Sequence, residues 1–120
     1  MVIDSSIWLE VFLDGALAEK CSSYLTSKSS IVPTSVIYEV YRKLKSEVSE
    51  DMALDAVAFM SSYQVLEINR EIALQAADLS IEHNLGFVDS LVLASAMTEK
   101  VSLLTLDNVF SDLPQSMVLR

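Results

Sequence analysis

Short apolar runs alternate along this chain with longer stretches in which apolar residues recur at helical spacing. The short runs are typical of strands buried on both faces of a parallel sheet. We expect such strands at Val2–Asp4, Ile31–Pro33, Gln64–Ile68, Ser102–Leu106 and Met117–Leu119. The helical patterns predict helices at Ser6–Leu13, Ala16–Ser27, Ser35–Lys45, Ser49–Ser62, Arg70–Asn84 and Asp89–Lys100. This alternation predicts a three-layer α/β/α fold in which helices cover both faces of a central parallel sheet of about five strands.

Two of the helical patterns also predict burial. Val36, Val40 and Leu44 form one apolar stripe, which is expected to face the core. The segment from Leu91 to Met97 is apolar nearly all round, so its helix should be deeply buried.

Length and composition indicate one globular domain spanning residues 1–120. A chain of 120 residues of which 52% are hydrophobic can build a substantial core. Its one cysteine, Cys21, cannot form an internal disulfide, and the apolar runs are far shorter than the ~20 residues of a spanning helix. No segment has the pattern of a signal peptide. We therefore expect a soluble cytoplasmic protein with no membrane association.

The charge balance is acidic, with 17 acidic residues against 8 basic ones and a formal net charge of −9. This counts against simple nucleic-acid binding, because Lys and Arg normally neutralise the phosphates. Any such activity would require a local basic patch, a bound metal ion, or both. The only real cluster of bases is Arg42, Lys43 and Lys45, and these are the candidates for contacting a phosphate backbone.

Four acidic residues stand where the chain is expected to pass from strand to helix or to begin a buried helix. They are Asp4, Glu39, Asp89 and Asp107. A parallel sheet brings the carboxyl ends of its strands to one edge, which is where open α/β sheets bind ligands. Carboxylates that meet there repel one another unless they take up protons or bind a cation. An all-oxygen site of this kind suits Mg²⁺ or Mn²⁺.

Each acid also has a purely structural interpretation. Asp4, Asp89 and Asp107 could cap the helices or turns that follow them, since Asp is a favoured cap. Glu39 could form a surface ion pair with Lys43, four residues later. The metal-site hypothesis therefore depends on all four acids lying together.

Other chemistries find little support. The only histidine, His83, precedes Asn84 and Gly86 at a predicted helix end, so a histidine-based zinc site or a Ser-His-Asp triad is not indicated. Neither the glycine pattern of dinucleotide sites nor that of P-loops is present.

Four segments, in order, resemble the motifs of PIN-domain ribonucleases, specifically the VapC-type toxins of VapBC toxin–antitoxin modules. They are V-I-D-S-S-I-W around Asp4, V-P-T-S-V-I-Y-E-V around Glu39, F-V-D-S-L-V-L-A-S-A around Asp89 and L-L-T-L-D-N-V-F around Asp107. The resemblance covers essentially the whole chain. Two positions depart from the family pattern: Ser90 stands where Ala is common, and Lys100 where Gly often precedes the fourth strand.

The resemblance implies an endoribonuclease that requires Mg²⁺ or Mn²⁺ and has a sheet of order 3-2-1-4-5. It makes Asp4, Glu39, Asp89 and Asp107 the catalytic acids, with Asp4, Asp89 and Asp107 as metal ligands and Ser6 in support. It also implies an RNA substrate, a cognate antitoxin and a homodimer. Two alternatives stay open: another metal-dependent phosphoesterase or DNase on the same fold, and a non-catalytic interaction protein that keeps the fold.

An interface is also suggested by two helices with apolar residues on more than one face. Helix Ala16–Ser27 carries Leu17, Cys21, Tyr24 and Leu25, and helix Ser49–Ser62 carries Leu54 and Phe59 beside its Met52 stripe. A second apolar face indicates a partner, unless both faces lie in one core.

Overall fold

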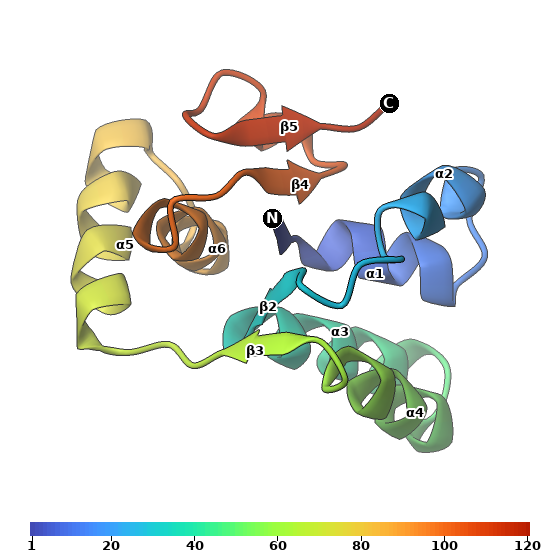
Figure 1. The fold of residues 1–120 in the computed structure, drawn as a ribbon. Helices are drawn as coiled ribbons and strands as arrows, with labels where there is room; N and C mark the ends of the chain where they lie inside the picture. Colours follow the sequence, from blue (N-terminus) through green and yellow to red (C-terminus); the bar gives the residue numbers. More distant parts are fainter.

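The computed structural model describes residues 1–120 and contains one all-parallel sheet with the strand order β3-β2-β1-β4-β5 (Figure 1). The strands are β1 (Val2–Ile3), β2 (Ile31–Pro33), β3 (Gln64–Leu66), β4 (Leu103–Thr105) and β5 (Ser116–Val118). Both the parallel sheet and the strand order expected from the sequence are confirmed. Each strand is two or three residues long, and most are shorter than predicted.

Six helices and one short 3₁₀ helix connect the strands. They are α1 (Ser5–Phe12), α2 (Ala18–Ser23), α3 (Thr34–Glu47), α4 (Glu50–Met60), α5 (Arg70–His83), α6 (Phe87–Thr98) and η1 (Asn108–Phe110). Helices α1 to α4 lie on one side of the sheet, and α5 and α6 lie on the other (Figure 1). From β1 to β3 each new strand is added toward one edge of the sheet, whereas from β3 to β4 the chain crosses back past β1 toward the other edge. Because crossovers between parallel strands are right-handed, this reversal places the helices before and after β3 on opposite faces.

One hydrophobic core of 28 buried residues joins the layers. The stripe of Val36, Val40 and Leu44 is fully buried, as predicted. All seven residues from Ser90 to Ala96 are buried, which confirms that α6 lies deep in the molecule. Because α6 runs back to feed β4, its N-terminus lies near the carboxyl ends of the strands, where Asp89 was expected to contribute to a site.

Several helix boundaries differ from the prediction. The helix expected at Ala16–Ser27 is limited to Ala18–Ser23, since Ser23 and Thr26 hydroxyls bond backbone carbonyls three residues back and compete with helix continuation. Helix α6 begins at Phe87, before Asp89, with Gly86 at its N-cap. Helix α3 runs two residues further than expected, to Glu47.

Of the two helices expected to have a second apolar face at an interface, only the one that carries Leu54 and Phe59 has this face exposed. In and beside α2, Cys21 and Leu25 are buried and Leu17 and Tyr24 pack against the same core, so the second face there is internal. Leu54 and Phe59 on α4 remain about half exposed. The most exposed large apolar side chains are elsewhere: Ile81 (85%), Phe87 (78%), Leu74 (64%) and Tyr38 (60%).

Three smaller expectations are also resolved. No helix combines the length and the apolar character that crossing a membrane requires. Cys21 is buried and unpaired. At the end of α5 the left-handed C-cap is Asn84 (φ 54°, ψ 44°), and His83 is the last helical residue, with Glu82 its neighbouring acid.

Candidate active site

Asp4 lies directly after β1 in the middle of the sheet and is only 5% exposed. The register pairs Ile3 with Leu104, so Asp4 faces Thr105 at the end of the neighbouring strand. Although Asp4 occupies the N-cap position of α1, its side chain makes no capping hydrogen bond. The capping interpretation of Asp4 is therefore wrong, and its carboxylate is directed elsewhere.

Two hydroxyls hold the Asp4 carboxylate. Ser6 Oγ donates to Asp4 Oδ2 at 2.8 Å, and Thr105 Oγ1 donates to the same oxygen at 2.7 Å. Each hydroxyl in turn accepts a backbone N–H, at 3.0 Å from Leu106 to Ser6 and at 3.0 Å from Asp107 to Thr105. The two hydroxyls also lie 3.2 Å from each other, so Ser6, Thr105 and Asp4 form one hydrogen-bonded group. Oδ1 accepts no hydrogen bond from a side chain, and the backbone amides of Ser5 and Ser6 also stabilise the carboxylate.

Burial raises the pKa of Asp4 above its usual value, and the two hydroxyl bonds only partly offset this effect. The ionised form is therefore held at a cost in the folded chain. A cation at Oδ1 would remove that cost.

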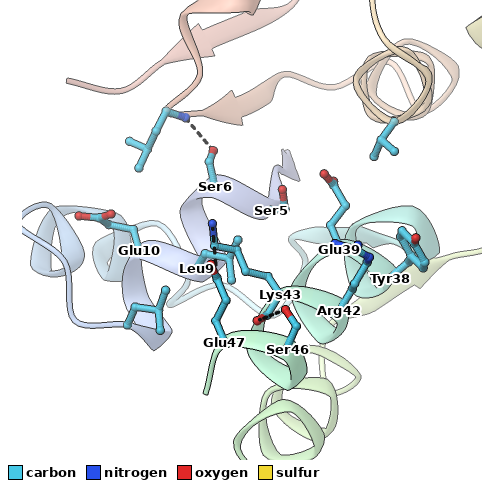
Figure 2. Close-up of a pocket in the computed structure, with 13 residues that line it drawn as sticks. Ser5, Ser6, Leu9, Glu10, Tyr38, Glu39, Arg42, Lys43, Ser46 and Glu47 are labelled. Atoms are coloured by element: carbon cyan, nitrogen blue, oxygen red, sulfur yellow. Dashed lines mark hydrogen bonds and ion pairs between the residues drawn. The ribbon is translucent and has the colours of Figure 1, made fainter. Parts of the chain in front are cut away.

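Glu39 extends from the second turn of α3 toward the start of α1 (Figure 2). Its pKa is raised to about 7, first by burial and then by the negative charges of Asp4 and Asp89. The alternative ion pair with Lys43 does not form, since Lys43 Nζ lies 3.6 Å from Glu47 Oε2 instead. Glu39 therefore belongs to the group of acids and takes up a proton near neutral pH.

Asp89 lies in the first turn of α6, half-buried, and does not cap the helix. Burial raises its pKa, and the charges of Asp4 and Asp107 add to this effect. A carboxylate in the first turn of a helix is normally favoured by the helix dipole. The upward shift shows that burial and repulsion from the other acids outweigh that benefit.

Asp107 is the exception among the four acids. It is exposed, and its Oδ1 accepts the backbone N–H of Val109 at 3.0 Å, so it caps η1 as one interpretation of the sequence predicted. It is still near enough to Asp89 for its charge to raise the pKa of that group. Asp107 therefore stands at the edge of the site.

A cavity of about 790 Å³ opens beside the acids (Figure 2). Glu39, Arg42 and Lys43 line it from α3, and Ser5 and Ser6 line it from α1. Val88 and Leu106, the residues next to Asp89 and Asp107, complete the side nearest the sheet. Of the four predicted site acids only Glu39 lines the cavity itself, while Asp4, Asp89 and Asp107 are each next to a lining residue in the sequence.

The three predicted RNA-contacting bases do not have equivalent positions. Arg42 and Lys43 line the cavity that contains Glu39. Lys45 does not line it, and its Nζ lies 3.3 Å from Tyr41 Oη and 3.8 Å from Glu50 Oε1. Lys45 is thus already engaged on the surface of α3, away from the acids.

The donor set suits a hard divalent cation in its chemistry. Asp4, Glu39 and Asp89 supply carboxylate oxygens, none of them is paired with a base, and each has a raised pKa. No group of three or more acids, histidines or cysteines lies close enough together to hold a metal ion, so at most two of these carboxylates could bind the same ion directly. An open arrangement fits Mg²⁺, which usually keeps several water ligands and takes only one or two carboxylates.

Thr105 is the site residue that sequence reasoning missed. It lies in the quoted segment L-L-T-L-D-N-V-F but was given no role. A polar residue that ends an otherwise apolar buried strand was the available signal, since a buried hydroxyl requires a hydrogen-bond partner. Its partner is Asp4, 101 residues earlier in the chain.

Comparison with known proteins places this arrangement in a family. A family model described as the PIN domain matches residues 1–115, and the chain therefore belongs to the PIN domain family, a family of nucleases. A comparison of the sequence with curated proteins finds no match.

Solved structures similar to this chain include a toxin and two toxin–antitoxin complexes. A toxin–antitoxin complex from Klebsiella pneumoniae has a TM-score of 0.82 at 20% identity over 98% of this chain and 95% of that one. VapC20 of Mycobacterium tuberculosis, described as a toxin that cleaves the sarcin–ricin loop, has a TM-score of 0.80 at 16% identity over 94% of each chain. VapBC2 of Rickettsia felis, bound to a promoter DNA fragment, has a TM-score of 0.78 at 14% identity over 98% of this chain and 96% of that one.

Proposed function

We propose that this protein is an endoribonuclease that uses Mg²⁺ or Mn²⁺ to cleave RNA phosphodiester bonds. The observation that carries the proposal is the group formed by Asp4, Glu39 and Asp89, whose carboxyl groups lie at the carboxyl edge of the sheet without any basic partner. Acids brought together in this way weaken the fold unless a cation binds. Membership of a nuclease family supplies the reaction class.

The position of each residue suggests its role in the site. Asp4 and Asp89 are the principal metal ligands, and Asp107 completes the site directly or through water. Ser6 and Thr105 position Asp4 by holding Oδ2, and Oδ1, which accepts no side-chain hydrogen bond, would be the oxygen that binds the ion. The metal ion would supply Lewis-acid activation of water and neutralise the charge that develops on the phosphodiester.

Glu39 is suited to hold and release a proton during the reaction. Its pKa of about 7 belongs to the metal-free chain, and a cation bound by the neighbouring Asp4 and Asp89 would lower that pKa, so that Glu39 would be ionised and able to accept a proton as a general base. Its carboxyl group extends toward the start of α1, where a water or a substrate hydroxyl would meet it (Figure 2).

In the cell, we propose that the chain is the toxin of a type II toxin–antitoxin pair acting in the cytoplasm as one domain. The structural likeness to toxin–antitoxin complexes supports a cognate antitoxin. The homodimer is proposed from the resemblance to VapC-type toxins alone. Light scattering on the purified chain at micromolar concentration tests the homodimer, and a monomer mass would contradict it.

Two other functions use the same fold. A phosphoesterase or DNase would need the same carboxylates, and the acidic surface of the chain, with net charge −9, fits a small substrate. In a non-catalytic interaction protein, acids that repel one another would lower stability without serving a reaction. The presence of Asp4, Glu39 and Asp89 without basic partners therefore favours an enzyme.

The proposal is tested by incubating the purified chain with an RNA, a single-stranded DNA and a small phosphodiester, with Mn²⁺ or Mg²⁺ and with a chelator. We expect cleavage of the RNA alone, and only with metal. Cleavage of DNA or of the small ester in preference to RNA would assign the site to the first alternative. Calorimetry that detects no Mn²⁺ binding would support the second.

The cavity position of Arg42 and Lys43 gives a separate prediction about RNA binding. If they contact phosphates, Arg42→Ala and Lys43→Ala should each weaken binding and reduce the slope of log affinity against log salt by about 0.7 for single-stranded RNA. Lys45→Ala is the matched control, because Lys45 is a base on the same helix that does not line the cavity. Equal effects of all three substitutions would show that only general charge matters.

A further inference from the structure

Two exposed aromatic side chains flank the group of acids. Tyr38, which is 60% exposed, precedes Glu39 on α3, and Phe87, which is 78% exposed, lies two residues before Asp89 at the start of α6. They come from different helices, and both line the same cleft. Large aromatic groups left this exposed beside an active site are candidates for binding substrate.

Tyr38 and Phe87 line one cleft of about 400 Å³. Ile68, Val88 and Leu91 form most of the remaining wall, and the only other polar lining residues are Thr34 and Ser35. Ser35 Oγ is buried without a hydrogen-bond partner. No charged residue lines this cleft, so it suits a flat, uncharged group that carries a few polar atoms.

The cleft adjoins the cavity of about 790 Å³ that contains Glu39, the acidic cavity. Tyr38 and Val88 are part of the lining of both, and the acidic cavity also contains Glu39, Arg42 and Lys43. A ligand that lies across Tyr38 would thus have a charged portion beside Arg42 and an uncharged portion beside Phe87. A nucleotide has this division, with its phosphate at one end and its base at the other.

We propose that the Tyr38–Phe87 cleft is a nucleobase subsite that binds the base next to the scissile phosphate. The proposal rests on the proposed ribonuclease function and extends it to substrate recognition. Aromatic side chains bind unpaired bases of single-stranded RNA by stacking, which requires exposed rings such as these. The Tyr38 hydroxyl can also donate to or accept from a base edge, which provides a means of preferring one base.

The protein as purified is tested with a short single-stranded RNA that it cleaves at one mapped position. Tyr38→Ala and Phe87→Ala should each raise KM by roughly 5- to 100-fold, with a smaller change in kcat. Tyr38→Phe keeps the ring and should stay within a few-fold of the wild type. Leu74→Ala is the matched control, because Leu74 is 64% exposed on α5 and lines neither the cleft nor the acidic cavity.

A second arm uses RNAs in which the nucleotide on either side of the cleaved bond is abasic. Loss of the stacked base should raise KM for the wild type but have little further effect on Tyr38→Ala, since both changes remove the same contact. Effects that simply multiply would overturn the subsite while leaving the ribonuclease function in place. If the wild type cleaves no RNA at all, the proposed function fails and the subsite fails with it.

Light scattering on each variant separates the base from a protein occupant. Phe87 also borders a second apolar cleft together with Ile81, so a second copy of the chain is the main competitor for this surface. We expect Tyr38→Ala and Phe87→Ala to keep the mass of the wild type. A fall in mass that accompanies the rise in KM would assign the surface to an interface between copies and overturn the base subsite.

Discussion

Asp4→Asn should reduce metal-dependent RNA cleavage by at least about a hundredfold while leaving the chain folded. Loss of residues that merely support a metal ligand typically costs 10–100-fold, and Asp4 is proposed as a ligand itself. The amide can keep its oxygen at the position of Oδ2, so that Ser6 and Thr105 still donate to it. Its NH₂ group then takes the position of Oδ1, and it cannot bind a cation.

Without metal, the same substitution should leave the free energy of unfolding unchanged or raise it. It replaces a buried carboxylate with a raised pKa by a neutral group of the same shape. Urea unfolding in a chelator measures this, and single-turnover cleavage with saturating Mn²⁺ measures activity. Cleavage at the wild-type rate would remove Asp4 from the ligand set. Thr105→Val is the companion variant, and we expect it to lower activity by less, because it loosens Asp4 without removing its charge.

The metal-free protein should become more stable as the pH falls from about 8 to about 5. Glu39 has a pKa of about 7 in the folded chain against an ordinary 4.5, so its contribution to stability is fully present below pH 4.5 and is lost as the pH rises through 7. Asp4 and Asp89 are shifted in the same direction. After allowance for its partial exposure, we expect Glu39 alone to change the free energy of unfolding by about 2 kcal/mol over its titration.

Unfolding in chelator at several pH values measures the effect, and the difference between the wild type and Glu39→Gln isolates the contribution of Glu39. Glu47→Gln serves as the control, since Glu47 is an exposed glutamate of the same helix whose partner is Lys43. Saturating Mn²⁺ should flatten the pH dependence, because the metal binds the ionised carboxylates. A stability that rises from pH 5 to pH 8 in chelator would contradict the proposed cluster of acids.

The sequence predicted the parallel sheet well because the relevant signals are local and repeated, whereas the strand order came from the resemblance to PIN-domain proteins. Short apolar strands flanked by amphipathic helices leave few alternatives to a parallel sheet, and the apolar segment from Leu91 to Met97 indicated the buried helix directly. The helix expected at Ala16–Ser27 failed because its serine and threonine hydroxyls bond to the backbone, which apolar periodicity does not detect.

The candidate site was predicted at the level of residues but not of contacts. The sequence indicates which acids stand at the strand ends, and the structure gives Asp4, Glu39 and Asp89 raised pKa values caused by burial and mutual repulsion. The sequence could not distinguish Asp107, which caps η1, from the other three acids. Nor could it connect Thr105 with Asp4, which is 101 residues away in the chain. Such long-range contacts depend on strand register, which short strands do not reveal.

The paired hydroxyls of Ser6 and Thr105 make two backbone amides into natural spectroscopic probes. The N–H groups of Leu106 and Asp107 each donate to a hydroxyl that donates in turn to Asp4 Oδ2. A change of charge at Asp4 polarises both chains of hydrogen bonds, so the amide chemical shifts of these two residues should follow its ionisation and its occupation by a cation. Nuclear magnetic resonance could thus follow events at the carboxylate from the backbone that directly follows β4, without any substitution in the site.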